Sequence, residues 1–265
     1  MNFRAVFRSL GTVALVLLLL PGKAAAADIH VMISASLYDV YTELGPTFER
    51  ETGHKLITTR GPSLGDSPEA IPNRLARGEA ADVLILDGAA ADELIRRGLA
   101  RPGSKVDLAR SQIGMVVKAG AAKPDISSVD AFKRTLAAAA SVAYSDSSSG
   151  TFLATRLFPE LLPGDQIARK SKKVRGPPSG EPVAAVVARG EAEIGFQQVS
   201  EVLHYPGVTF VGAIPRELHP GFTFSGAIAS SAKEPDAGAA LLRFLASPAA
   251  AAAIEKAGLN LPAGR

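Results

Sequence analysis

The sequence predicts an α/β fold in which mostly parallel β-sheets are flanked by helices. Short apolar segments alternate along the chain with segments of helical periodicity, and the connections between them are short. Several predicted strands are almost continuously apolar, such as residues 81–86 after Asp82, which is typical of strands covered on both faces. The alternation also recurs as a second strand–helix–strand unit near residues 183–197. These observations together favour parallel sheets built from βα units.

In the first part of the chain, each predicted helix ends near a glycine. Leu37, Val40, Tyr41, Leu44 and Phe48 recur at helical spacing before Gly53, and the next two helices stop at Gly78 and Gly98. The predicted strands are 29–34, 54–59 and 81–86, and the helices are 37–52, a segment through Ile71 and Leu75, and 89–97.

The second part of the chain continues in the same way. The predicted strands are 112–118, 142–144, 194–197, 208–211 and 222–229, and the helices are 128–136, 183–189, 235–246 and a last one from Pro248 to Gly258. The basic run 169–174 is interpreted as a solvated face. The chain shows no sequence repeat and no long linker.

The N-terminus has the pattern of a secretory signal peptide. Arg4 and Arg8 form a basic region, residues 10–20 are apolar, and the alanines at 24–27 offer a cleavage site, so residues 1–27 are predicted to be removed. The apolar run is too short to span a bilayer as a mature helix. We therefore expect a periplasmic protein that is not membrane-spanning after cleavage.

Composition excludes several classes of protein. The chain has 29 basic and 26 acidic residues, and three basic residues leave with the signal, so the mature chain is formally neutral and shows no sign of nucleic-acid binding. It has no cysteine, which excludes disulfides and thiolate metal sites. The four histidines, His30, His54, His204 and His219, lack metal-ligand spacing, and no metal or cofactor is predicted.

The stretch from Tyr144 to Phe152 is the first candidate binding site. A predicted strand runs into three serines and Gly150, and a helix follows. Free N–H groups and the positive dipole end at a helix start favour an anion, although a serine-rich N-cap is also a common structural feature. Ser36 and Ser63 likewise follow predicted strands, at the edge where parallel sheets bind ligands.

Several weak motifs occur in an order typical of one family. They are Ser34-Ala35-Ser36-Leu37, Phe48 to Gly53, Arg77 to Val83, Gly190 to Gly195, and Phe244 to Pro248 followed by Ala257-Gly258-Leu259. With these motifs the mature chain resembles the periplasmic molybdate-binding proteins, which belong to the type II two-lobed solute-binding proteins of ABC importers.

The resemblance implies two lobes that close around a ligand by hinge motion. Lobe 1 is expected at residues 28–108 plus 218–265, and lobe 2 at residues 109–217. The implied ligand-binding residues are Ser36, Ser63, Ser149, Gly150, Gly180 and Gln198, and the implied partners are a small anionic ligand and an inner-membrane permease. The protein is expected to be a monomer. Neutral hydroxyl and N–H donors can hold a tetrahedral oxyanion without a buried counter-charge.

The loops depart from the molybdate pattern, so two ligand classes remain open. Residues 60–63 and 148–152 differ from the family loops, and Gln198 stands where a tyrosine is expected. The first alternative is a molybdate- or tungstate-like oxyanion. The second is a small di- or tricarboxylate, because Arg60 or Arg175 could pair with a carboxylate.

Function as an enzyme is not expected. Ser36 has no evident base partner in the sequence, and no G-x-S-x-G elbow is present, so no catalytic residue is predicted. The leading prediction is a solute-binding protein of an ABC importer. A binding protein that signals to a membrane receptor would use the same fold and pocket.

Overall fold

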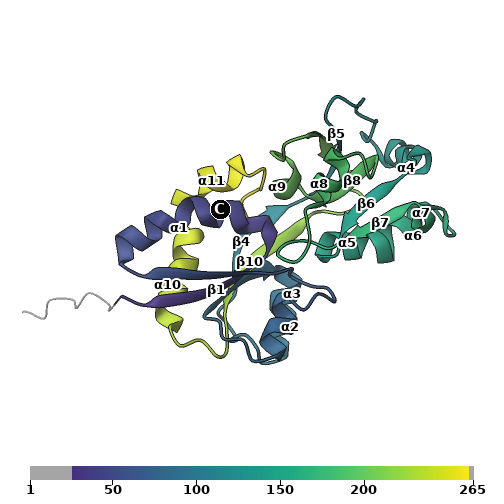
Figure 1. Cartoon of the computed structure of the whole chain (residues 1–265). Helices are drawn as coiled ribbons and strands as arrows, with labels where there is room; N and C mark the ends of the chain where they lie inside the picture. The colour runs from purple at the N-terminus through teal and green to yellow at the C-terminus, as the bar shows by residue number, and fades with distance from the viewer. Residues whose placement is uncertain (1–25, 263–265) are drawn as a thin grey trace, which may run out of the picture.

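The computed structural model describes residues 26–262 and shows two lobes side by side (Figure 1). Each lobe is built on a five-stranded sheet within this described part of the chain. The predicted signal peptide falls largely on residues 1–25, which lie outside the described residues. The two-lobed α/β fold is confirmed.

Lobe 1 has the strand order β2-β1-β3-β10-β4. Strands β1, β2 and β3 are parallel, whereas β10 is antiparallel to both β3 and β4. The strands are β1 (Asp28–Ile33), β2 (Lys55–Arg60), β3 (Val83–Asp87), β4 (Val106–Ser111) and β10 (Phe222–Ile228), and the helices are α1 (Tyr38–Thr52), α2 (Ile71–Ala76), α3 (Gly88–Arg96), α10 (Pro235–Leu245) and α11 (Ala251–Lys256).

Lobe 2 repeats this design with the strand order β7-β6-β8-β5-β9. Strands β7, β6 and β8 are parallel, and β5 is antiparallel to β8 and β9. The strands are β5 (Ile113–Lys118), β6 (Val142–Ser145), β7 (Ser171–Val174), β8 (Ile194–Gln198) and β9 (Val208–Ala213), and the helices are α4 (Val129–Ala138), α5 (Ser148–Phe152), α6 (Phe158–Leu161), α7 (Gln166–Arg169), α8 (Val183–Ala188) and α9 (Val199–Val202).

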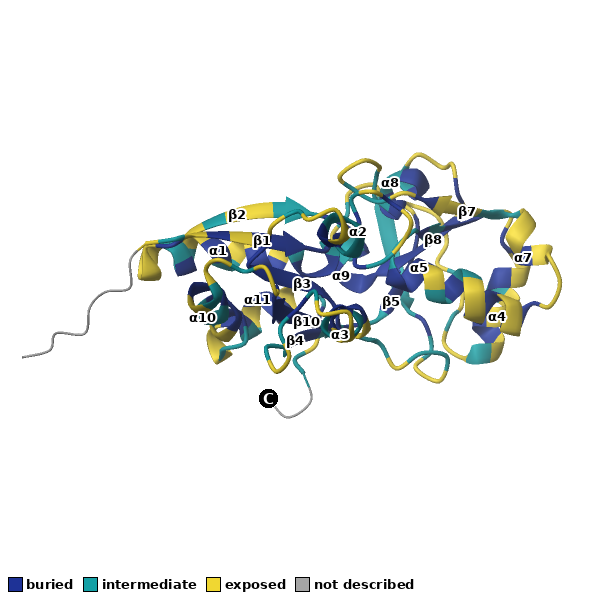
Figure 2. Ribbon diagram, turned by 90° about the horizontal axis from the view of Figure 1, so that it is seen from below, coloured by how far each residue is buried: buried dark blue, intermediate teal, exposed yellow. Residues whose placement is uncertain are grey.

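Helices cover both faces of each sheet, which explains the continuous apolar strands. In lobe 1, one face packs against α1, α10 and α11 and the other against α2 and α3. In lobe 2, the helices from α4 to α7 cover one face, and α8 and α9 cover the other. Figure 2 shows central strands such as β3 as buried, and the edge strand β2 and the outer faces of helices such as α4 and α7 as largely exposed. Each lobe therefore has its own core.

Two strands were not predicted. Strand β4 mixes polar and apolar residues, and β7 is an edge strand whose Lys172 and Lys173 are exposed. Charged side chains are a common way of protecting such an edge. The basic run at residues 169–174 is therefore largely exposed to solvent, as predicted, and also contains a strand of the sheet.

The chain crosses between the lobes twice. It passes from β4 to β5 at Gln112 and returns between β9 and β10, through residues 214–221. The predicted lobe boundaries at residues 108/109 and 217/218 remain predictions. Among the described residues, no single helix is long and apolar enough to cross a membrane.

Candidate functional site

A small pocket lies between the lobes, where several parallel strands end. We call it the serine pocket, and its volume is about 30 Å³. Lobe 1 contributes Ser34, Ala35, Ser36, Arg60, Gly61 and Pro62, and lobe 2 contributes Ser145, Asp146, Ser147, Gly176, Pro177, Gln197 and Glu201. The residues follow or end β1, β2, β6, β7 and β8, so the topology brings their side chains together.

Glu201 is the carboxyl group at the centre of the polar contacts in the serine pocket. It lies in α9, and its carboxyl group accepts hydrogen bonds from one side chain of each lobe. The Ser36 hydroxyl donates to Oε1 of Glu201 over 3.0 Å, and the side-chain amide of Gln197 donates to Oε2. Burial raises the pKa of Glu201 to about 7, and the hydrogen bonds and the nearby Arg60 charge only partly offset it. The group therefore titrates close to neutral pH.

The backbone holds both partners of Glu201 in place. Ser200 Oγ donates to the carbonyl oxygen of Ser36 over 2.9 Å, which joins α9 to the turn Ala35–Leu37 of the other lobe. The N–H of Val183 donates to Oε1 of Gln197 over 3.0 Å. Because this bond occupies the amide oxygen of Gln197, its NH₂ group faces Glu201.

Arg60 provides a positive charge at the same pocket. Its guanidinium carbon lies 4.0 Å from the ring centroid of Tyr38, in a cation–π contact. Among residues 26–262, Arg60 makes no ion pair with a carboxylate. The guanidinium is thus held in position and remains available to a carboxylate ligand.

Four buried side-chain atoms have no hydrogen-bond partner within the described part of the chain. They are the hydroxyls of Ser34 and Ser148 and both polar atoms of the Gln198 side chain. Buried polar groups are normally hydrogen-bonded. Ser34 lines the serine pocket and Ser148 lines a larger neighbouring pocket, so these two hydroxyls are placed to bind a ligand.

The six predicted ligand residues occupy different environments. Ser36 lines the serine pocket. The Ser63 hydroxyl accepts from the N–H of Asp87 over 2.9 Å, and Ser149 Oγ lies 3.4 Å from Ser145 Oγ. Ser63 and Ser149 are buried beside the pocket and are not among its lining residues.

Gly150, Gly180 and Gln198 also lie outside the pocket lining. A Cβ at Gly150 would lie 1.6 Å from the carbonyl oxygen of Ser145, and one at Gly180 would lie 2.0 Å from that of Arg175. Only glycine fits such close backbone approaches. Gln198 follows Gln197 in β8, so the two side chains point to opposite faces of the sheet.

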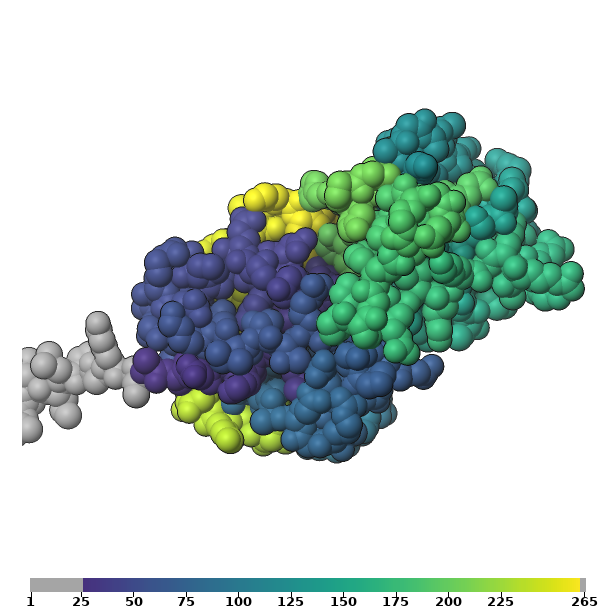
Figure 3. Space-filling model, in the orientation of Figure 1, coloured from purple at the N-terminus to yellow at the C-terminus, as the bar shows by residue number. Residues whose placement is uncertain are grey.

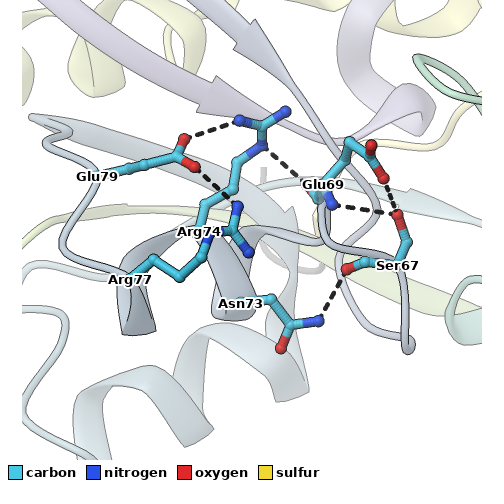
Figure 4. Close-up of polar contacts among 6 residues, drawn as sticks. All are labelled: Ser67, Glu69, Asn73, Arg74, Arg77 and Glu79. Carbon is cyan, nitrogen blue, oxygen red and sulfur yellow. Dashed lines mark hydrogen bonds and ion pairs between the residues drawn. The ribbon is translucent and has the colours of Figure 1, made fainter.

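A loop at residues 61–70 closes one side of the cleft and is tied to α2 (Figure 4). Asn73 Nδ2 donates to the carbonyl of Ser67 over 2.8 Å, and Arg74 Nε donates to the carbonyl of Glu69 over 3.0 Å. Across the lobes, Ser179 Oγ donates to Oε2 of Glu69 over 3.1 Å. In Figure 3 the two lobes are in contact along this boundary. The lobes are therefore closed on one another.

A second, larger pocket of about 570 Å³ also lies between the lobes. Its charged groups are largely satisfied locally: Lys105 Nζ pairs with Asp92 over 2.8 Å, and Asp107 accepts from Ser225. Its wall includes the ring of His219, stacked on Phe222 at 4.3 Å. We take the serine pocket as the functional site because it contains the half-buried, doubly hydrogen-bonded carboxyl of Glu201 and the guanidinium of Arg60, which has no carboxylate partner among residues 26–262.

Sequence reasoning missed Glu201 and Gln197. Glu201 directly follows the segment Gly195 to Ser200, and a carboxylate just beyond a strand end in lobe 2 is a signal that could have been noted. Its pairing with Ser36, 165 residues away, could not be seen from spacing.

Two relatives match nearly the whole chain. An aconitate isomerase from Pseudomonas sp. is 46% identical over 260 residues, covering 96% of this chain and 98% of the relative. The molybdate-binding protein ModA from Azotobacter vinelandii is 28% identical, covering 92% of this chain and 94% of that protein. The predicted resemblance to molybdate-binding proteins is confirmed.

The prediction that the chain is not an enzyme is contradicted by the first of these relatives, which carries an enzyme name. That prediction rested on the absence of a base partner for Ser36. In the structure the Ser36 hydroxyl donates a hydrogen bond to Oε1 of Glu201.

The fold and the family model agree. The periplasmic molybdate-binding protein of Azotobacter vinelandii superimposes with a TM-score of 0.68 at 20% identity, covering 88% of this chain and 99% of that structure. The family model described as bacterial extracellular solute-binding protein matches residues 29–260. The chain therefore belongs to the bacterial extracellular solute-binding protein family.

Proposed function

We propose that this protein isomerises aconitate, or a closely similar unsaturated tricarboxylate, with Glu201 as the group that transfers the proton. The proposal rests on the environment of the Glu201 carboxyl group. Its carboxyl group is enclosed between Ser36 and Gln197, and burial raises its pKa to about 7. The 46% identical relative named aconitate isomerase supports the choice of substrate.

The reaction needs one base and no oxidant or reductant. In aconitate a methylene group adjoins a carbon–carbon double bond. Glu201 takes a proton from the methylene, so that a C–H bond breaks and an O–H bond forms. The electron pair spreads over the three carbons of the allylic system and the attached carboxylates. Return of a proton to the other terminal carbon places the double bond at the opposite end, and its geometry can change.

The pKa of Glu201 suits both steps of this cycle. A base that must both take and return a proton works best when its pKa is close to the operating pH. With a pKa of about 7, protonated and ionised forms of Glu201 both exist at neutral pH. The two hydrogen bonds hold the carboxyl in one orientation, which favours transfer along a defined direction.

The remaining polar groups suit the carboxylates of such a substrate. Arg60 can donate two hydrogen bonds to one carboxylate in a bidentate pair, and the Ser34 hydroxyl can donate to another. The serine pocket is too small for a tricarboxylate, so the lobes must open to admit one. Hinge motion about the segments at Gln112 and residues 214–221 would allow this.

The direct test is to incubate the purified mature protein with the trans isomer of aconitate and follow the vinyl proton signals by NMR. We expect conversion to the cis isomer. Glu201→Gln should lower the turnover rate by about 10²- to 10⁴-fold, the range for loss of a general base. As a matched control, Glu43→Gln alters an exposed carboxyl of α1 that pairs with Lys256 and does not line the pocket, and we expect it to retain turnover.

A second candidate function is the binding of a small anion for an ABC importer. It is favoured by membership of the solute-binding protein family and by the 28% identity with a molybdate-binding protein. In this case the ligand would be an oxyanion or an organic acid, the site would be periplasmic, and the partner would be an inner-membrane permease. A thermal shift with a ligand and no turnover of aconitate would favour this function over the isomerase.

A further inference from the structure

We infer that the carboxylate of Glu201 also selects the class of anion: it excludes compact inorganic oxyanions and admits organic acids that present a C–H edge to it. This inference deepens the proposed function, since it rests on the same pocket being the ligand site. It assigns Glu201 a role in specificity that does not depend on catalysis.

A pocket for a tetrahedral oxyanion works through neutral donors. Hydroxyl and N–H groups can satisfy the charged oxygens without bringing a second charge out of water. In this chain the Ser36 hydroxyl is already used: it donates to Glu201 Oε1 over 3.0 Å. An oxyanion entering the pocket would lose this donor and would gain a negative neighbour.

The balance of charge in the serine pocket opposes a compact anion. Its lining residues include two carboxyl groups, Glu201 and Asp146, and one guanidinium, Arg60. Asp146 Oδ1 accepts from the N–H of Gly176 over 3.1 Å, so it is held at the pocket wall. When both carboxyls are ionised, one positive charge faces two negative ones, and like charges brought together disfavour the wrong ligand.

Shape decides which anions can avoid this repulsion. A tetrahedral oxyanion such as sulfate or molybdate has charged oxygens on every side, so any orientation turns one toward Glu201. An organic acid can direct its carboxylates at Arg60 and the hydroxyls and turn a methylene edge toward Glu201. The same edge carries the proton that the proposed reaction removes.

The test is calorimetric titration of sulfate and molybdate into the mature protein at pH 8, where Glu201 is ionised. We expect Glu201→Gln and Glu201→Ala to bind at least one of these oxyanions at least tenfold more tightly than the unmodified protein does. Circular dichroism would establish that both variants are folded. Glu43→Gln should leave oxyanion affinity unchanged, because this exposed carboxyl lies outside the pocket lining.

Affinities within twofold of the unmodified protein in both folded Glu201 variants would overturn the inference. Micromolar binding of molybdate by the unmodified protein would also overturn it. Turnover of aconitate is measured separately. If the unmodified protein does not turn over aconitate, the proposed isomerase activity is refuted. Tighter oxyanion binding by the Glu201 variants would still support the role of Glu201 in selecting the ligand.

Discussion

The raised pKa of Glu201 predicts how the stability of the protein depends on pH. The perturbation is Glu201→Gln, which removes the titrating group while keeping its shape. Burial raises the pKa of Glu201 from its usual 4.5 to about 7, so the folded state disfavours the ionised carboxyl. Below pH 4.5 both folded and unfolded states are protonated, and the penalty is absent. As the pH rises toward 7 the unfolded state ionises first, and stability falls.

The size of the effect follows from these two pKa values. Between pH 5 and pH 8, a shift from 4.5 to about 7 costs the folded state about 2 to 3 kcal/mol. In Glu201→Gln this cost is absent at every pH. The variant also places a second amide NH₂ against the Gln197 NH₂, but that cost does not depend on pH and cancels in the comparison.

The assay is urea unfolding of both proteins at pH 5 and pH 8. At the higher pH the variant should gain about 2 to 3 kcal/mol in unfolding free energy relative to the unmodified protein. Glu160→Gln, at an exposed carboxylate of lobe 2, serves as the matched control. A pH dependence that is the same in the Glu201 variant and the unmodified protein would refute the burial of this carboxyl.

Three further predictions concern other residues. Arg60→Lys loses the planar contact with Tyr38 and bidentate pairing, so the KM for aconitate should rise roughly tenfold with a smaller change in kcat; an unchanged KM would remove Arg60 from the site. Gly150→Ala places a methyl group 1.6 Å from the Ser145 carbonyl oxygen and should lower the melting temperature by several degrees; an unchanged melting temperature would contradict the close approach. Asp82→Ala removes a buried carboxylate that accepts three backbone N–H groups, and should cost about 3 kcal/mol or more in urea unfolding; a loss below about 1 kcal/mol would show that those groups find other partners.

Some of the candidate site could be predicted from the chain, and some could not. Ser36 follows a strand that is recognisable by its apolar run, and parallel strands expose their carboxyl ends at one edge. Arg60 ends a second such strand and was considered as a carboxylate partner. Glu201 offered only a weak signal, a carboxylate just beyond a strand end, because a single glutamate there is common and its protonation depends on what surrounds it in space.

The sequence by itself determined the fold class, the order of most helices and strands, and the family. These features depend on periodicity, glycine stops and short motifs, which are local along the chain. Strands β4 and β7 are not predicted from the sequence, because their mixed polarity shows no clear hydrophobic period.

Only the tertiary structure decided the chemistry of the cleft. Folding brings Glu201 of one lobe to Ser36 of the other across 165 residues and encloses its carboxyl. A pKa reflects desolvation and nearby donors in space, so no local pattern in the sequence carries it. In the same structure Arg60 has no carboxylate partner within the described part of the chain. A base and a guanidinium that can bind a carboxylate thus lie in one pocket, and this is the basis of the proposed activity.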